Sequence, residues 1–324
     1  MRCHVFKLVA TALLSYAFGY FMHRSQRCGA VPLPHLSTRS TLPLPTNCTL
    51  QDFGGNPSTG YGVWRLCNES LSWRTVVFAF GVGPDASFEA GLAEAFGSSV
   101  VSFDPTIDQN KYEAALHVPH ARPLKPVQRS RLRFLNYGIG TVDGVLTFYS
   151  PGSASMTTVA NLPGYSAVLK APVFTMKTLL QLASVTRIDV LKLDVEGVEF
   201  ELFEDVAFTR WLISADGPEQ LAIEFHDRLL KRGANMSVSL HAYRRRLCFY
   251  AVMRRGGYSR RHISRSGEEI LMVRTRASVL MPPQESERRS RRRDNLDDLA
   301  GLQHPAPGRC RATRRHGNRA TRHH

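Results

Sequence analysis

Short apolar runs that alternate with helix-like segments constrain the fold of this 324-residue chain more than any other feature. The predicted strands are residues 75–80, 99–103, 132–135, 145–149, 188–193, 220–223, 248–253 and 269–273. Runs without polar alternation are typical of strands that helices cover on both faces, as in parallel sheets. Phe88, Leu92 and Phe96 recur every four residues after the first run, which predicts one face of a helix. The sequence therefore predicts a doubly wound α/β domain that ends in a hairpin of the last two strands.

Glycine and polar residues recur at the carboxyl ends of these predicted strands. The candidates are Gly81, Gly83, Asp104, Gly138, Gly140, Asp194, Glu196, Glu224 and His226. In an open α/β sheet, ligands bind outside the carboxyl ends of the strands, near the point where the strand order reverses. We therefore expect these residues to lie around one binding site.

The first of these turns has the sequence Gly81-Val-Gly83, and Asp104 follows at the end of the next predicted strand. This spacing suits a carboxylate that accepts hydrogen bonds from a nucleotide ribose. The alternative is that Asp104 only caps the turn before Pro105. Pro84 stands after the turn and the third glycine of a dinucleotide fingerprint is missing. The pattern therefore favours a nucleoside cofactor without a phosphate.

Four segments of the chain resemble FkbM-type methyltransferases and related methyltransferase-like proteins of the methyltransferase domain 22 kind. The segments are VFAFGVGPDASFE (77–89), FDP (103–105), LKLDVEGVE (191–199) and IEFH (223–226). The resemblance covers about residues 72–275, and KLDVEG is its most specific part. It implies an S-adenosylmethionine-dependent methyltransferase with the class I, Rossmann-like fold. In that fold a mostly parallel seven-stranded sheet takes one antiparallel strand from its C-terminal hairpin.

The resemblance also implies a cofactor site made of Gly81, Gly83, Asp104 and Gly138. By this resemblance, we expect the two glycines of the first turn to approach the amino-acid part of S-adenosylmethionine and Asp104 to bind its ribose. We expect Asp194 and Glu196 to lie beside the methyl group.

Four titratable residues are placed for the chemistry of methyl transfer: Asp194, Glu196, Glu224 and His226. Transfer from a sulfonium requires alignment of nucleophile, methyl and sulfur, and removal of a proton when the nucleophile is a hydroxyl. We expect these residues to be catalytic, with His226 as the base, because a histidine titrates near neutral pH. The alternative is that the carboxylates and His226 hold a divalent metal, but the sequence predicts no particular metal. A third possibility is that Glu196 or Glu224 caps a helix or binds the cofactor's ammonium.

The N-terminus has the features of a targeting segment. Arg2 and Lys7 precede an apolar run over residues 8–22, so residues 1–27 are expected to be a cytosolic tail and a signal-anchor helix. A cleaved signal peptide is the alternative. Three glycosylation sequons follow, at Asn47, Asn68 and Asn235. We therefore expect a single-pass type II membrane protein with its catalytic domain in the lumen of the Golgi or endoplasmic reticulum.

The remaining segments are expected to be a linker over residues 28–71, a methyltransferase domain over 72–277 and a disordered tail over 278–324. The net charge is +15, and most of it lies at the C-terminal end, where residues 254–324 contain 18 arginines and 7 acidic residues. An excess of positive charge that is confined to a tail says little about the domain, so nucleic acid is not an expected partner. A hydroxyl-bearing acceptor is expected instead.

Two other functions fit parts of the sequence. A non-catalytic Arg-rich protein would bind nucleic acid or acidic glycans through its tail. A Golgi nucleotide-sugar transferase would share the anchor and linker, but the Asp-x-Asp motif of a metal-dependent one is missing. Cys48 and Cys67 bracket a turn-rich stretch and form either a disulfide in an oxidising lumen or two free thiols.

Overall fold

The computed structural model describes residues 47–56, 62–152, 156–159, 162–230 and 238–275, with the side chains of α8 described from residue 245. The expected anchor over residues 1–27, the tail over 278–324 and the sequon at Asn235 lie outside these ranges. No helix within the described ranges is long and apolar enough to cross a membrane.

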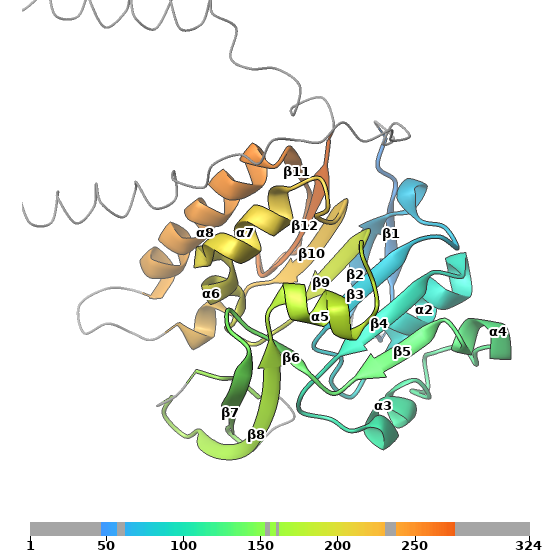
Figure 1. Cartoon of the computed structure of the whole chain (residues 1–324), viewed down its shortest axis with the longest axis horizontal. Helices are drawn as coiled ribbons and strands as arrows, with labels where there is room; N and C mark the ends of the chain where they lie inside the picture. The colour runs from blue at the N-terminus through green and yellow to red at the C-terminus, as the bar shows by residue number, and fades with distance from the viewer. Residues whose placement is uncertain (1–46, 57–61, 153–155, 160–161, 231–237, 276–324) are drawn as a thin grey trace, which may run out of the picture. The chain divides into compact units, whose positions relative to one another are not determined.

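A seven-stranded sheet forms the centre of the domain (Figure 1). Its order is β11 (Tyr258–Ile263), β12 (Glu269–Arg274), β10 (Gln220–Glu224), β9 (Val190–Leu193), β3 (Val76–Phe80), β4 (Ser99–Phe103) and β5 (Leu132–Leu135). The pairs from β10 to β5 are parallel, and β12 runs antiparallel to both of its neighbours. The expected α/β fold with a large mixed sheet is therefore confirmed.

The chain builds this sheet outward from β3 in two directions. It first adds β4 and β5 on one side, and later adds β9 and β10 on the other. The strand order thus reverses at β3, and the carboxyl ends of β3, β4, β9 and β10 meet at the same edge. This is the position where ligands bind in open α/β sheets.

Both faces of the sheet are covered, which explains the unbroken apolar runs. Phe78 and Phe80 of β3 point into one core, while Val77 and Ala79 point into the other, and all four are buried. The first core is covered by α5 (Met176–Leu182), α6 (Glu199–Glu204), α7 (Val206–Ile213) and α8 (Val238–Arg255). The second is covered by α2 (Ser87–Phe96), α3 (Gln109–Ala115) and a two-stranded hairpin, with the one-turn α4 (Pro126–Arg129) beside α2.

A separate three-stranded sheet lies between β5 and β9 in the sequence. It contains β6 (Gly138–Ile139), β8 (Ser166–Phe174) and β7 (Gly144–Ser150), in that order. Only β7 is predicted from the sequence. In β8 the first residues are exposed and Pro172 interrupts the run, so the apolar pattern is weak.

The predicted strand over residues 248–253 is wrong, because these residues belong to α8. Phe249, Val252 and Met253 are buried, and their spacing of three and four residues is that of one helix face. A short apolar run does not distinguish a strand from a buried helix turn. The terminal hairpin is instead formed by β11 and β12.

The hairpin of β1 (Leu50–Phe53) and β2 (Trp64–Cys67) falls in the segment predicted as a linker. Phe53, Trp64 and Leu66 are buried in the second core, so the domain begins well before residue 72. The linker prediction is corrected accordingly for residues 50–71.

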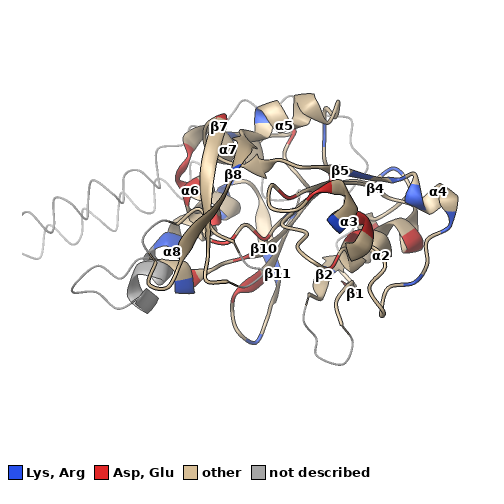
Figure 2. Cartoon of the chain, turned by 90° about the horizontal axis from the view of Figure 1, so that it is seen from below, with Lys and Arg blue, Asp and Glu red and all other residues tan. Residues whose placement is uncertain are grey.

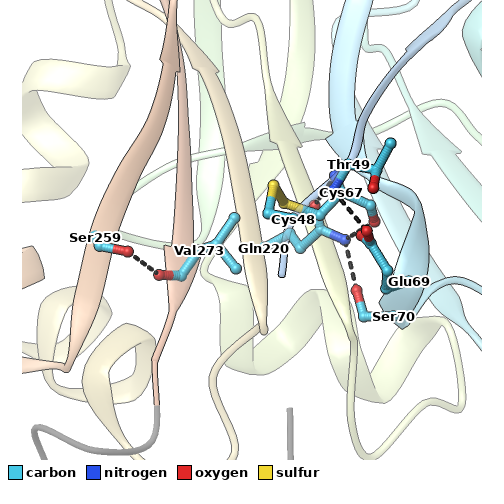
Figure 3. The surroundings of a disulfide bond; sticks show 8 residues. All are labelled: Cys48, Thr49, Cys67, Glu69, Ser70, Gln220, Ser259 and Val273. Atoms are coloured by element: carbon cyan, nitrogen blue, oxygen red, sulfur yellow. Dashed lines mark hydrogen bonds between the residues drawn. A yellow bond between two sulfur atoms is a disulfide. The ribbon is translucent and has the colours of Figure 1, made fainter. Parts of the chain in front are cut away.

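A disulfide closes the hairpin on itself, and a buried glutamine fixes it to the sheet (Figure 3). Cys48 and Cys67 form a disulfide with a Cα–Cα distance of 4.9 Å, which confirms the first alternative for this pair. The side chain of Gln220, on β10, accepts from Cys67 N–H and donates to Cys67 O, each at 2.8 Å. It also donates to Ser70 Oγ at 2.7 Å. The hairpin is thus closed by a covalent bond and held to β10 by hydrogen bonds, of which the two to Cys67 are buried.

We predict that replacing both cysteines, Cys48→Ser with Cys67→Ser, lowers the free energy of unfolding by about 3 kcal/mol. The disulfide closes a loop between the two cysteines and so restricts the conformations of the unfolded chain. The two cysteines are 19 residues apart. Urea unfolding of the oxidised parent and the double variant, followed by tryptophan fluorescence, measures the difference. Equal midpoints and slopes would show that the disulfide contributes nothing to stability.

Candidate functional site

The carboxyl ends of the central strands open into a cleft of about 680 Å³. Eight of the residues predicted from the sequence line it: Gly81, Gly83, Asp104, Gly138, Asp194, Glu196, Glu224 and His226. The ninth candidate, Gly140, is not among the lining residues. Figure 2 shows acidic positions around β10 and α6 and basic positions on α4 and α8. The structure therefore brings the strand-end residues into one site with an acidic end.

The turn after β3 needs glycine for two different reasons. Gly81 and Gly83 have φ values of +76° and +60°, which side chains rarely adopt. A Cβ on Gly81 would also lie 1.8 Å from the carbonyl oxygen of Asp194, whereas a Cβ on Gly83 would contact nothing within 4 Å. The turn therefore packs directly against the end of β9 and leaves open space on its other side.

The Asp104 carboxylate holds this turn in place. Its Oδ2 accepts hydrogen bonds from Val82 N–H at 3.1 Å and Gly83 N–H at 2.9 Å. Its Oδ1 accepts from Thr106 N–H at 2.8 Å and from the Thr106 hydroxyl at 2.6 Å. A carboxylate has about four acceptor positions, and all four are used here. The predicted ribose contact stays a prediction. The bonds to Thr106 match the alternative that Asp104 caps the turn at Pro105, and the bonds to Val82 and Gly83 add a positioning role that the sequence did not indicate.

Glu199 is a site residue that the sequence analysis missed. It is fully buried at the start of α6, and its Oε1 accepts from the backbone N–H of His226 at 2.7 Å and lies 3.2 Å from His226 Nδ1. Its Oε2 accepts from Gly197 N–H at 2.8 Å. These bonds orient the imidazole so that Nε2 faces the cleft. Glu199 ends the LKLDVEGVE segment, but nothing in that pattern distinguishes a buried acid from an exposed helix start.

His226 Nε2 lies among three carboxylates. It is 3.4 Å from Asp194 Oδ1, 3.6 Å from Glu196 Oε2 and 3.6 Å from Glu224 Oε1. Burial of the ring works to lower its pKa, but hydrogen bonds to Asp194 and Glu199 and the charges of Glu199 and Glu196 outweigh it and raise the pKa to about 11. His226 is therefore an imidazolium at neutral pH. This differs from the expected role of base, because a charged imidazolium has no lone pair to accept a proton.

The two neighbouring carboxyl groups respond in opposite directions. Burial, together with the charge of Asp194, raises the pKa of Glu224 to about 7. Burial also opposes ionisation of Asp194, but the hydrogen bond from His226 and the charge of Lys192 lower its pKa below the ordinary value. At neutral pH Asp194 is a fixed anion and Glu224 exchanges a proton. Paired groups whose pKa values are pushed apart are typical of acid–base sites.

Asp194, Glu196 and His226 also form a set that fits a divalent cation. Each offers one ligand atom, and these atoms lie within 4.8 Å of one another. Two carboxylates and an imidazole are suitable ligands for several divalent metals. A metal would require His226 to lose the proton on Nε2, since a nitrogen ligand must be unprotonated. Arg228 Nη2 donates to Glu196 Oε2 at 3.0 Å and would compete for that ligand.

We predict that Asp104→Asn lowers the free energy of unfolding of the cofactor-free protein by about 1–3 kcal/mol, because an amide cannot accept all the buried donors around it. Asp108→Asn is the matched control: Asp108 is exposed and caps α3 by accepting from Lys111 N–H, a role in which asparagine is equally good. Thermal and urea unfolding without cofactor measure both. Unchanged stability of Asp104→Asn with weakened cofactor binding would instead favour direct ribose contact.

The glycine turn and most of the residues that line the cleft, including Asp194, Glu196, Glu224 and His226, lie within the part of the chain that matches a known family. Residues 60–259 match the family model of the methyltransferase FkbM domain. A search of curated proteins found no significant match to the chain. Because the match covers more than half of the sequence and includes the strands that form the cleft, the chain belongs to the FkbM methyltransferase domain family.

Proposed function

We propose that the protein is an S-adenosylmethionine-dependent methyltransferase that methylates a hydroxyl group of a glycan or a small molecule. The observation that carries the proposal is the direct contact between the glycine turn after β3 and the acidic cluster after β9 and β10. A nucleoside cofactor and a proton acceptor then share one cleft. The strand order, with one antiparallel strand between β10 and β11, supports the class I methyltransferase fold.

The residues present suit this cofactor. Gly83 leaves open space beside the turn, Gly81 admits the end of β9, and Gly138 lines the cleft near Pro105. A sulfonium cation is also compatible with the surplus of carboxylates at the acidic end, while a phosphate would be repelled there. When bound, the cofactor supplies an electrophilic methyl group. The turn would hold its amino-acid part, and Asp104 would act by fixing the turn.

Glu224 is the group best suited to take the proton from the acceptor. It is partly accessible from the cleft, and its pKa of about 7 lets it be unprotonated in a large fraction of molecules at neutral pH. His226 stays protonated and balances Asp194 and Glu196, so the anionic groups do not all repel one another. The acceptor hydroxyl would lose its proton to a Glu224 carboxylate oxygen as its oxygen bonds to the methyl group, while the methyl–sulfur bond breaks and S-adenosylhomocysteine leaves.

We further propose a location in the secretory pathway, with the domain in the lumen and the N-terminal apolar run as the membrane anchor. The Cys48–Cys67 disulfide supports this proposal, because disulfides persist in oxidising compartments. Asn47 is exposed at the start of the described domain, as a glycosylation site must be.

We predict that Glu224→Gln reduces methyl transfer by about 10²–10⁴-fold, the usual contribution of a general base. Binding of S-adenosylhomocysteine should change little, since the substitution removes no contact to the cofactor turn. Calorimetry measures binding, and transfer of a radiolabelled methyl group to a panel of monosaccharides and phenols measures activity. The parent's rate should rise with pH and level off above about pH 7, as Glu224 loses its proton. Glu201→Gln, on the exposed side of α6, is the control.

Two outcomes would count against the proposed function. A parent protein that binds neither S-adenosylmethionine nor S-adenosylhomocysteine is not this kind of methyltransferase. Activity that survives in Glu224→Gln with the same pH profile would assign the base to another group.

The lumenal location predicts that the full-length protein from a eukaryotic host carries N-linked glycans. Treatment with peptide N-glycosidase should increase its gel mobility, and Asn47→Gln should remove part of that shift. Complete protease digestion of the domain in intact microsomes, without any shift, would place the domain on the cytosolic side.

A further inference from the structure

Lys192 is a buried ammonium group in the wall of the cleft. It lies on β9, between apolar residues, and is only 3% exposed, yet it lines the cleft together with Trp64 and Phe88. Its Nζ lies 4.8 Å from the centre of the Trp64 ring and 5.8 Å from that of Phe88. The two rings stabilise the cation without offering it an ordinary hydrogen-bond acceptor.

The ammonium has more donors than the described residues use. It carries three N–H groups and donates to Gly81 O at 2.7 Å. Asp194 Oδ2 is 4.0 Å away, beyond hydrogen-bond distance. Glu89 is also buried nearby, where burial raises its pKa to about 7 and the charge of Lys192 opposes that rise. Neither of its carboxyl oxygens has a hydrogen-bond partner among the described residues. Lys192 therefore keeps donors for a ligand in the cleft.

The charges around the cleft make Lys192 distinctive. The other cationic side chains that line it are Arg228 and His226, and both are engaged with carboxylates. Asp85, Glu224 and Glu269 add further negative charge to the lining. An anionic group of a ligand would be repelled along most of this wall and attracted at Lys192, next to the glycine turn.

We propose that Lys192 binds the α-carboxylate of the amino-acid part of the cofactor, an inference that rests on the proposed function. Its bond to Gly81 O places the ammonium beside the turn that would hold this part. The ligand's positively charged groups would then face the carboxylates, and its one negative group would face Lys192. The residue would select an intact α-amino acid over a ligand that lacks the carboxylate.

Decarboxylated S-adenosylmethionine tests this proposal, because it keeps the nucleoside, the sulfonium and the amine. The parent should bind S-adenosylmethionine about 10- to 100-fold more tightly than the decarboxylated form, the contribution expected of hydrogen bonds between charged groups. In Lys192→Met this preference should fall to within about threefold, through weaker binding of S-adenosylmethionine alone. Calorimetry with the full-length protein gives the four dissociation constants.

The controls separate binding from folding. Lys192→Gln removes the charge but keeps a polar side chain, so it should also lose most of the preference. Lys177→Met removes an exposed lysine on α5 and should keep the parent's preference. Circular dichroism and melting temperature verify that each variant folds.

Each outcome has a defined meaning. If the parent binds S-adenosylmethionine and folded Lys192 variants keep the full preference, the carboxylate is bound elsewhere and the proposal fails alone. If the variants weaken both ligands equally, Lys192 only supports the turn, which also overturns the proposal. If the parent binds neither ligand, the proposed function itself fails.

Discussion

The site depends on one buried carboxylate, that of Glu199. An ionised acid without water is stable only when hydrogen bonds and opposite charge compensate for the lost hydration. Glu199 obtains both from Gly197 N–H and from the backbone and ring of His226. These bonds join the chain after β9 to the chain after β10. They also fix the direction of His226 Nε2, which in turn determines how much charge the carboxylates around it can carry.

This arrangement explains why three acidic side chains can lie close together without a large loss of stability from charge repulsion. The imidazolium lies within 3.6 Å of Asp194, Glu196 and Glu224, and Arg228 adds a second positive charge on Glu196. Glu224 receives the least compensation, because it is buried and faces Asp194. Its proton is therefore the one that is exchanged near neutral pH. The division of roles follows from burial and from which charges face each carboxyl group, and no sequence pattern specifies either.

The sequence predicted the central strands well and the outer parts poorly, for physical reasons. β3, β4, β9 and β10 are buried on both faces, so each leaves an apolar run with a turn residue after it. β8 has exposed side chains over its first half, and the β1–β2 hairpin lies among glycines that are typical of a linker. The strand predicted over residues 248–253 failed because four or five apolar residues fit a helix face equally well.

The sequence predicted the location of the site better than the chemical roles of its residues. Parallel strands bring their carboxyl ends to one edge, so the strand-end positions were certain to converge if the strands were right. The roles of Asp104 and His226 depend on which lone pairs are already occupied and where the protons lie. Lys192 left a detectable signal, since a lysine inside an apolar strand is rare, but its contact with Gly81 O required the fold.

The β1–β2 hairpin limits the distance that can separate the domain from the chain segment that precedes it. A linker that ran to residue 71 would add roughly 80 Å of reach in a fully extended chain. The Cys48–Cys67 disulfide closes this segment into a hairpin, and the buried Gln220 bonds hold the hairpin on the sheet, where Trp64 lines the cleft. The hairpin therefore both shortens the chain that precedes the domain and contributes Trp64 to the wall of the cleft.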